Sequence, residues 1–450
     1  MKTSCYLSKN IYTQEILWEK ACLLSREREN ILEGLKERHH HWLSYDLSER
    51  MLLIKSIGQI LDRQRDYIAG MICEEVGRCF RECIAEIEKT IHLIDYYTQI
   101  APQMLKPKFI QTEAQMSQVC YEPLGVILAV MPWNYPIWQV LRFAVPALCG
   151  GNACLVKPAP SVGRLTEYFF SQLPSVLPLD CIFLADTDVE WAIQQTQGLA
   201  FTGSVEVGKK LASMAGRHLK KSVLELGGSN AFIVLEDADL RAAARDACYS
   251  RFRDSGQSCN AAKRIIVERK VAKELEKYLL NEIINLRWGD PRLPETHMGP
   301  LHLAGAAQQM QEYVNDALKR GARCVFGGSR LPQAIFYPPT LLTQVARGSR
   351  VLTEEVFGPV LPVVVVDSKS EAIKVANETE FGLGATIYSK DIQSALQAAK
   401  QLEVGSVYIN RHTSSELKMP FGGVKKSGYG RELSEFGLLE WMNIKSYWQR

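Results

Sequence analysis

Short apolar segments alternate with longer segments of helical periodicity from residue 125 onwards, and this alternation constrains the fold more than any other feature. Strands are expected over 125–130, 153–156, 182–185, 231–234, 264–267, 361–366 and 407–409. Helices are expected between them, over 207–216, 238–251 and 272–284. The pattern predicts an α/β fold, and its two consecutive strand-and-helix series suggest two domains with a ligand cleft between them.

The first hundred residues have a different texture and are predicted to be helical. Apolar residues recur at helical spacing after Ser48, a candidate helix cap, and again from Cys83 to about Tyr97. Around residue 107 the pattern changes to a polar, extended segment, 109–119, which we interpret as a hairpin arm leading into the strand at 125–130.

Composition narrows the class of protein. A chain of 450 residues is too long for one compact core, and 53 basic against 50 acidic residues gives no support to nucleic-acid or membrane-surface binding. The longest apolar runs, 124–131 and 360–366, fall far short of the roughly 20 residues that span a bilayer. The first eleven residues lack the apolar core of a secretory signal. The 12 cysteines form no regular framework, which predicts free thiols and a cytoplasmic protein.

Two polar segments within this pattern suggest chemistry. Cys259 follows a glycine-bearing polar turn and precedes a strand, and a thiolate is a strong nucleophile towards a carbonyl carbon. Taken alone, a cysteine is more often a buried core residue. Glu225 lies in an apolar strand that opens onto Gly227 and Gly228, where burial would raise its pKa and suit it to general-base work. The alternative is a strand-end glutamate bound to a backbone amide.

Together, the segments around Glu225 and Cys259 resemble the paired signatures of the aldehyde dehydrogenase superfamily. The resemblance runs from about Glu122 to Tyr447, and further motifs follow in the family's order: Pro132-Trp133-Asn134-Tyr135-Pro136, Lys157-Pro158, Phe201-Thr202-Gly203-Ser204, Glu354-Glu355-Val356-Phe357-Gly358-Pro359 and Pro420-Phe421-Gly422-Gly423. It implies a Rossmann-like cofactor domain (1–106 and 122–227), an α/β catalytic domain (228–428) and a small β oligomerisation arm and tail (107–121 and 438–450).

The resemblance also implies catalytic roles. Cys259 would add to the aldehyde and form a thiohemiacetal, while the Asn134 side chain and the backbone N–H of Cys259 stabilise the oxyanion. Hydride transfer to a nicotinamide would leave a thioester, and Glu225 would activate the water that hydrolyses it. The expected cofactor is therefore NAD or NADP, and no metal is expected.

The cofactor residues carry over in the same way. The strand-to-helix turn at 201–208 resembles the family's pyrophosphate-contacting element, although it lacks the usual G-x-G-x-x-G pattern. Lys157 resembles the lysine that holds the adenosine ribose, and Glu355 with Phe357 resembles the pair that holds the nicotinamide ribose and ring; core packing is the alternative for Phe357. The expected cofactor-binding residues are Trp133, Lys157, Gly203, Ser204, Gly208, Leu226, Glu355 and Phe357.

One departure leaves the choice of cofactor open. Many NAD-preferring relatives carry a glutamate three residues after the ribose lysine, and NADP-using relatives often carry serine or threonine there. This chain has Pro160, followed by Ser161. Proline supplies neither a repelling charge nor a hydroxyl, so the sequence is compatible with both cofactors.

Two arginines narrow the substrate class. Arg142 follows Asn134 by eight residues and Arg253 precedes Cys259 by six, at positions where the bacterial NAD(P)-dependent succinate-semialdehyde dehydrogenases carry a carboxylate-binding pair. Ser415 falls where those enzymes have a carboxylate-binding serine. Two guanidinium groups facing one pocket favour a bidentate carboxylate. The alternative reading makes each arginine an ion-pair partner within the protein.

Other readings make different predictions. A CoA-acylating or phosphorylating relative would not need Glu225, and a non-catalytic protein of the same fold would lose Cys259, Glu225 or Asn134. Another semialdehyde, such as glutarate semialdehyde, or a general aliphatic aldehyde stays open as the substrate. The arm and tail predict a homodimer or homotetramer. The consecutive His39, His40 and His41 are expected to form an exposed polar patch.

Overall fold

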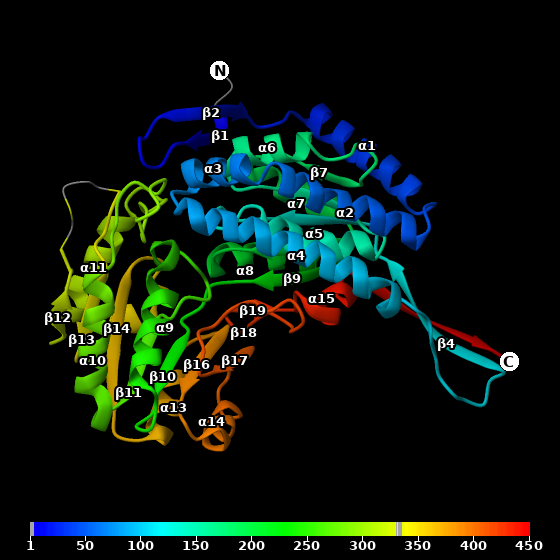
Figure 1. The fold of residues 1–450 in the computed structure, drawn as a ribbon. Coiled ribbons are helices and arrows are strands. Elements are labelled where there is room, and N and C mark those ends of the chain that lie inside the picture. Colours follow the sequence, from blue (N-terminus) through cyan, green and yellow to red (C-terminus); the bar gives the residue numbers. More distant parts are fainter. Residues whose placement is uncertain (1–3, 330, 332–334) are drawn as a thin grey trace.

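The computed structural model describes residues 4–329, 331 and 335–450, and places two mostly parallel sheets in one body from which a β arm projects. Figure 1 shows the C-terminus at the far end of this arm. The α/β fold expected from the sequence is confirmed.

The first sheet has six strands in the order β19-β9-β8-β5-β6-β7. Strands β5 to β9 are parallel, and β19 pairs with β9 in the antiparallel direction. Successive strands run outward from β5 to β7 on one side and from β8 to β9 on the other, so the strand order reverses between β5 and β8. The strands are β5 Val126–Val130, β6 Ala153–Lys157, β7 Leu179–Cys181, β8 Gly198–Thr202, β9 Lys221–Glu225 and β19 Gly428–Tyr429.

Helices cover both faces of this sheet. Along β5, Ile127 and Ala129 join a core with α2, α4 and α5, whereas Val126 and Leu128 join a second core with α1, α7 and α8. This alternation is the period of two expected of a strand. The helices are α1 Ser25–Trp42, α2 Leu47–Arg63, α3 Arg65–Val76, α4 Phe80–Met104, α5 Trp138–Cys149, α6 Gly163–Ser171, α7 Val189–Gln195 and α8 Val205–Arg217.

The structure corrects the sequence expectations at three places in this region. The chain begins with an antiparallel hairpin, β1 Ser4–Lys9 and β2 Ile16–Ala21, where helix was expected. Distant partners hold it, because the Tyr6 hydroxyl donates to the Leu184 carbonyl and the Trp18 indole donates to Glu167. The strand expected at 182–185 is instead Leu179–Cys181, since apolarity there reflects burial rather than strand pairing. Asp46, not Ser48, caps α2.

The second sheet has seven strands in the order β12-β13-β14-β11-β10-β16-β17, all parallel except β12. Its strands are β10 Ala231–Val234, β11 Arg264–Glu268, β12 Arg323–Phe326, β13 Thr340–Thr343, β14 Val360–Val366, β16 Gly384–Tyr388 and β17 Ser406–Ile409. Its helices are α9 Leu240–Phe252, α10 Arg269–Ile284, α11 Ala306–Lys319, α12 Arg350–Thr353, α13 Lys369–Asn377 and α14 Ile392–Ala399. A separate antiparallel pair joins β15 Phe381–Gly382 to β18 Val424–Lys425.

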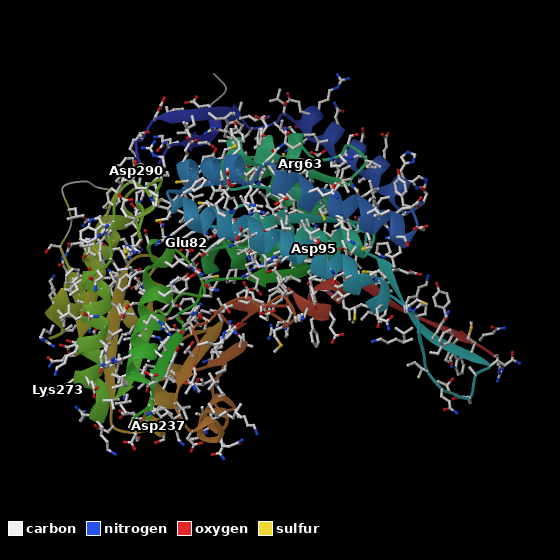
Figure 2. All side chains as sticks on the ribbon, in the orientation of Figure 1. Arg63, Glu82, Asp95, Asp237, Lys273 and Asp290 are labelled. Carbon is white, nitrogen blue, oxygen red and sulfur yellow. The ribbon has the colours of Figure 1, made fainter. Side chains whose placement is uncertain are left out.

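The arm is a three-stranded antiparallel sheet in the order β20-β4-β3. Strand β20, Met442–Gln449, pairs along the whole of β4, Met116–Pro123, and β3 is Lys108–Phe109. The short helix α15, Ser434–Leu439, precedes β20. Side chains project from both faces of the arm (Figure 2), and Phe109, Ile444 and Trp448 are each more than 60% exposed.

Ten cysteines of the described part of the chain are free, but Cys22 is disulfide-bonded, so the expectation that every thiol stays free is wrong at that position. His39 is partly buried and its ring contacts the Gly151 carbonyl at 3.0 Å, so the three histidines are not a uniformly exposed patch. Among the described residues, no helix is long and apolar enough to cross a membrane.

Candidate active site

The carboxyl ends of the first sheet's parallel strands bring the expected site residues to one edge. Lys157 ends β6 and Glu225 ends β9, while Trp133 and Asn134 follow β5 and Gly203 follows β8. In open α/β sheets, ligands bind at this edge where the strand order reverses.

A strained turn carries Cys259 to this edge. The 3-10 segment η3, Arg253–Gly256, has positive φ at Asp254 (53°) and Ser255 (55°), which non-glycine residues rarely adopt. Gly256 (φ 75°) lies so close to the Gly358 carbonyl that a Cβ would be 2.4 Å from its oxygen. The turn is thus held by tertiary contacts, and the Asn230 side chain donates to the Cys259 carbonyl at 3.1 Å.

A buried ion-pair network supports the turn. Arg78 donates through Nε to Asp254 Oδ1 at 2.6 Å, through Nη1 to Glu86, and through Nη1 to the Asn134 carbonyl at 3.3 Å. The Tyr135 hydroxyl donates to the same Asp254 carboxylate. Arg78 therefore ties the Asn134 segment to the Cys259 turn. Sequence reasoning missed this residue, because only the charges at Arg78, Glu82 and Glu86, four residues apart, hint at a buried cluster.

Asn134 is buried and oriented by two hydrogen bonds. Its Nδ2 donates to the Gln257 carbonyl at 3.1 Å, and its Oδ1 accepts from the Gln139 side chain at 3.1 Å. An amide nitrogen carries two hydrogens. One N–H of Asn134 therefore stays free to donate to another acceptor.

Glu225 is buried, and its Oε1 has no hydrogen-bond partner among the described residues. The strand-end alternative, a glutamate bound to a backbone amide, thus finds no support at this oxygen. Burial raises the pKa of Glu225 well above its usual value, and the Glu432 carboxylate raises it further against the opposing effect of Arg142. A carboxylate with a raised pKa is a stronger base.

The surroundings of the Cys259 side chain favour its thiol form. Burial raises its pKa to about 11, with Arg142 lowering it and the carboxylates of Glu355 and Glu225 raising it. Arg142 is thus the strongest influence that favours the thiolate.

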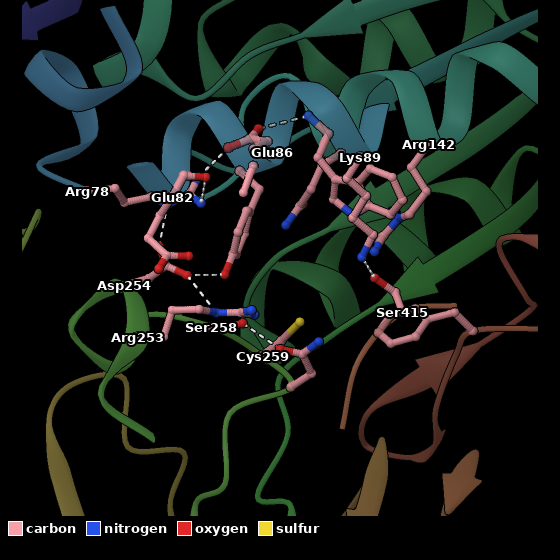
Figure 3. A pocket seen from close by; sticks show the side chains of 16 residues that line it. Arg78, Glu82, Glu86, Lys89, Arg142, Arg253, Asp254, Ser258, Cys259 and Ser415 are labelled. Carbon is pink, nitrogen blue, oxygen red and sulfur yellow. Dashed lines mark hydrogen bonds and ion pairs between the residues drawn. The ribbon is translucent and has the colours of Figure 1, made fainter. Parts of the chain in front are cut away.

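Cys259 shares a cavity of about 120 Å³ with Arg142, Arg253 and Ser415, the three residues expected to bind a carboxylate (Figure 3). Both arginines also have partners within the protein. Arg142 Nη2 lies 2.5 Å from Glu432 Oε2, and Arg253 Nε lies 3.3 Å from Asp254 Oδ2. Ser415 accepts a hydrogen bond from Lys89. Sequence reasoning did not identify Lys89 as a site residue.

The expected cofactor residues lie along the same edge. Lys157 is 5% exposed and its Nζ lies 3.2 Å from Asp186 Oδ1. Glu355 accepts from the Gly228 N–H at 3.1 Å, and its Oε2 would lie 2.1 Å from a Cβ at Gly227. The Trp133 ring stacks on the His302 ring, with 4.0 Å between ring centroids, and contacts the Phe357 ring edge-on, with 5.9 Å between centroids.

The helix start after β8 fits a phosphate. Ser204 caps α8, and Gly208 in its first turn packs so closely on Leu226 that a Cβ would be 2.5 Å from that side chain. Helix N-termini present backbone N–H groups to anions. Near the position that discriminates the two cofactors in relatives, Pro160 begins the segment η1, Pro160–Val162, and the Ser161 hydroxyl contacts His302 Nε2 at 2.8 Å.

The sequence matches the aldehyde dehydrogenase family over residues 3–447. The chain belongs to this family. It is 39% identical to the succinate semialdehyde dehydrogenase [NAD(P)+] Sad of Escherichia coli (strain K12), over 94% of this chain and 93% of that protein. It is 38% identical to the succinate-semialdehyde dehydrogenase [NADP(+)] of Deinococcus radiodurans, over 98% of this chain and 94% of that protein.

A solved structure is similar over nearly the whole chain. The succinic semialdehyde dehydrogenase of Streptococcus pyogenes, in complex with NADP+, superposes with a TM-score of 0.96 at 32% identity, covering 99% of both chains. The resemblance to the family recognised from the sequence, and the fold it implied, are confirmed.

Proposed function

We propose that this aldehyde dehydrogenase oxidises succinate semialdehyde, or a similar carboxylated aldehyde, to the acid with NAD+ or NADP+. The observation that carries the proposal is the cavity in which Cys259 lies with Arg142, Arg253 and Ser415. A nucleophile and carboxylate-binding groups in one small cavity suit a short substrate with an aldehyde at one end and a carboxylate at the other. The names of the relatives from E. coli and D. radiodurans agree with this substrate.

Cys259 begins the reaction. Its Sγ forms a bond to the aldehyde carbon, the thiol proton is released to solvent, and the carbonyl oxygen becomes an alkoxide. The free N–H of Asn134 and the backbone N–H of Cys259 stabilise this alkoxide. Removing the hydride from the same carbon leaves a thioester on Cys259.

Glu225 completes the reaction by activating water. Its carboxylate takes a proton from the water as the new C–O bond forms and the C–S bond breaks, and the proton then passes to the Cys259 sulfur. The free thiol and the ionised Glu225 are restored. The unpartnered oxygen of Glu225 and its raised pKa support this role.

The residues at the sheet edge fit a nicotinamide dinucleotide. The buried carboxylate of Glu355, held beside Gly227 and Gly228, and the ammonium of Lys157 would bind the two riboses, and the start of α8 at Ser204 would bind the pyrophosphate. Trp133, Phe357 and Leu226 supply apolar contacts. When bound, the nicotinamide supplies the hydride acceptor.

The remaining sequence expectations are part of the proposal. We retain the proposed division into a cofactor domain (1–106 and 122–227) and a catalytic domain (228–428), together with a cytoplasmic location. The division is supported by the separate sheets that contain β5 to β9 and β10 to β14. The arm exposes Phe109, Ile444 and Trp448, as expected for a surface that a second copy covers in a homodimer or homotetramer. A clean monomer in size-exclusion chromatography would contradict the assembly.

The test compares succinate semialdehyde with butanal, each with NAD+ and with NADP+, in steady-state assays. A higher kcat/KM for succinate semialdehyde supports the carboxylated substrate, and equal values would overturn it. Cys259→Ala should abolish turnover of both aldehydes. Retained turnover in that variant would refute the assigned nucleophile.

A further inference from the structure

Lys89 lines the cavity with Cys259 beside three arginines, Arg78, Arg142 and Arg253, and it differs from them in its partners. Each arginine lies within 4.0 Å of a carboxylate. Arg78 pairs with Asp254 and Glu86. Arg142 pairs with Glu432, and Arg253 pairs with Asp254. No ion pair joins Lys89 to a carboxylate of the described residues; its Nζ donates to the Ser415 hydroxyl and lies 4.3 Å from the centre of the Trp138 ring.

The position of Lys89 on α4 directs it into the cavity. Glu82, Glu86 and Lys89 lie at spacings of four and three residues and so share one face of the helix, and all of them line the cavity (Figure 3). Glu86 is occupied by Arg78 and by the backbone N–H groups of Ile137 and Trp138. Its charge is therefore already compensated, and no carboxylate of the described residues forms an ion pair with Lys89.

We propose that Lys89 is a specificity-determining residue that binds the distal carboxylate of the substrate together with Ser415. This inference rests on the proposed function, which supplies the carboxylated aldehyde. Because Ser415 accepts from Lys89, its own hydroxyl hydrogen is free to donate. A carboxylate beside the two groups would receive one hydrogen bond from each, while Arg142 and Arg253 keep their partners within the protein and add a positive field.

The surroundings of Lys89 make this binding dependent on pH. Burial, together with the guanidinium groups of Arg253 and Arg142, lowers the pKa of Lys89 to about 7, while Glu416 and Cys259 act in the opposite direction. Glu82 and Glu86 face the cavity from the same helix, and Asp254 from η3. In the free protein the amine is thus largely neutral at pH 8, and a bound carboxylate favours its protonated form. Binding above pH 7 should therefore take up a proton.

The first experiment measures Lys89→Met with both aldehydes, because methionine keeps an unbranched side chain without the charge. We expect kcat/KM for succinate semialdehyde to fall about 10- to 100-fold, the range for losing a hydrogen bond to a charged group, through KM rather than kcat. Turnover of butanal should change less than about threefold, which also shows that the variant folds. The control Lys106→Met removes an equal charge from an exposed position just after α4 and should leave both substrates unaffected.

The second experiment separates substrate binding from a merely structural role. Calorimetric titration with succinate at pH 8, in two buffers of different ionisation enthalpy, should show proton uptake by the wild type and none by Lys89→Met. In the wild type, KM for succinate semialdehyde should rise above pH 7 relative to the KM for butanal, and this difference should vanish in the variant.

The two proposals fail in distinguishable ways. If the wild type does not prefer succinate semialdehyde to butanal, the proposed function is wrong. If the wild type has this preference and Lys89→Met keeps it with unchanged proton uptake, Lys89 does not bind the carboxylate. A variant that loses both aldehydes equally would also overturn the assignment, since it would place Lys89 in structure rather than specificity.

Discussion

Replacing Asp254 with asparagine should destabilise the protein at the turn that carries Cys259. The Asp254 side chain is 1% exposed and is bound by Arg78 at 2.6 Å, by Arg253 at 3.3 Å and by the Tyr135 hydroxyl. Asparagine keeps the shape and tolerates the positive φ of 53°. The substitution therefore removes the charge with little change in backbone preference.

The expected loss follows from the burial of the pair. Removing one partner of a buried ion pair costs about 3–5 kcal/mol, and the lower end applies here because Glu86 still compensates Arg78. A loss of about 3 kcal/mol raises the unfolding equilibrium constant about 150-fold. Burial acts to raise the pKa of Asp254, but Arg78 and Arg253 outweigh it and hold the pKa below its usual value.

The pH dependence has a definite sign. A carboxyl group with a lowered pKa in the folded state stabilises it above the unfolded-state pKa, and loses this effect as the pH falls through the folded-state value. The difference between wild type and Asp254→Asn should thus be constant from about pH 5 to pH 8 and shrink below about pH 4.

Urea-induced unfolding, followed by tryptophan fluorescence at one protein concentration, measures the effect. The control is Asp62→Asn, which breaks the surface pair with Arg65, where Asp62 is 60% exposed. That pair should contribute less than about 1 kcal/mol. Equal urea midpoints for wild type and Asp254→Asn would refute the assigned role of the buried network.

Three further predictions concern the site chemistry. Alkylation of Cys259 by iodoacetamide in the free protein should accelerate about tenfold per pH unit from pH 7 to pH 10, because its pKa is about 11; a plateau below pH 8 would contradict this. Arg142→Gln should move that profile to higher pH as well as raise KM for succinate semialdehyde, and an unmoved profile would show that Arg142 does not act on the thiol. Glu225→Gln should keep a rapid first turnover of hydride transfer but lose steady-state turnover. Stopped-flow absorbance of the reduced nicotinamide measures both phases. Loss of the first turnover would assign Glu225 to an earlier step.

The chemistry of this chain was more predictable from its sequence than the shape of its pocket. Cys259, Glu225 and Asn134 lie in short motifs beside strands, so the strand pattern alone brings Asn134 and Glu225 to one sheet edge. The strained turn at Asp254 and Ser255 could not be foreseen, because contacts from distant segments impose its positive φ values.

The residues that line the pocket from α4 were harder to find. Hydrophobic periodicity predicts that the apolar face of an amphipathic helix is buried. It does not show whether another segment also covers polar residues on the opposite face. Lys89 is of this kind, and Arg78 lies just before the same helix; α5, η3 and the segment at Ser415 line the cavity with both of them. The β1–β2 hairpin escaped prediction for a related reason, since its partners lie more than a hundred residues away.

The catalytic residues and Lys89 belong to different elements of the fold, and this separation affects how the substrate specificity of such an enzyme can change. Asn134, Glu225 and Cys259 are attached to backbone that the sheets or the Arg78 network hold, so substitutions there disturb the reaction itself. Lys89 instead projects into the cavity from one turn of the long helix α4, whose apolar residues pack in the core on α2 and α5. A substitution at this position can change which distal group of the aldehyde is bound while the catalytic residues stay the same. Lys89 is therefore a suitable first position for laboratory selection of new substrate specificities.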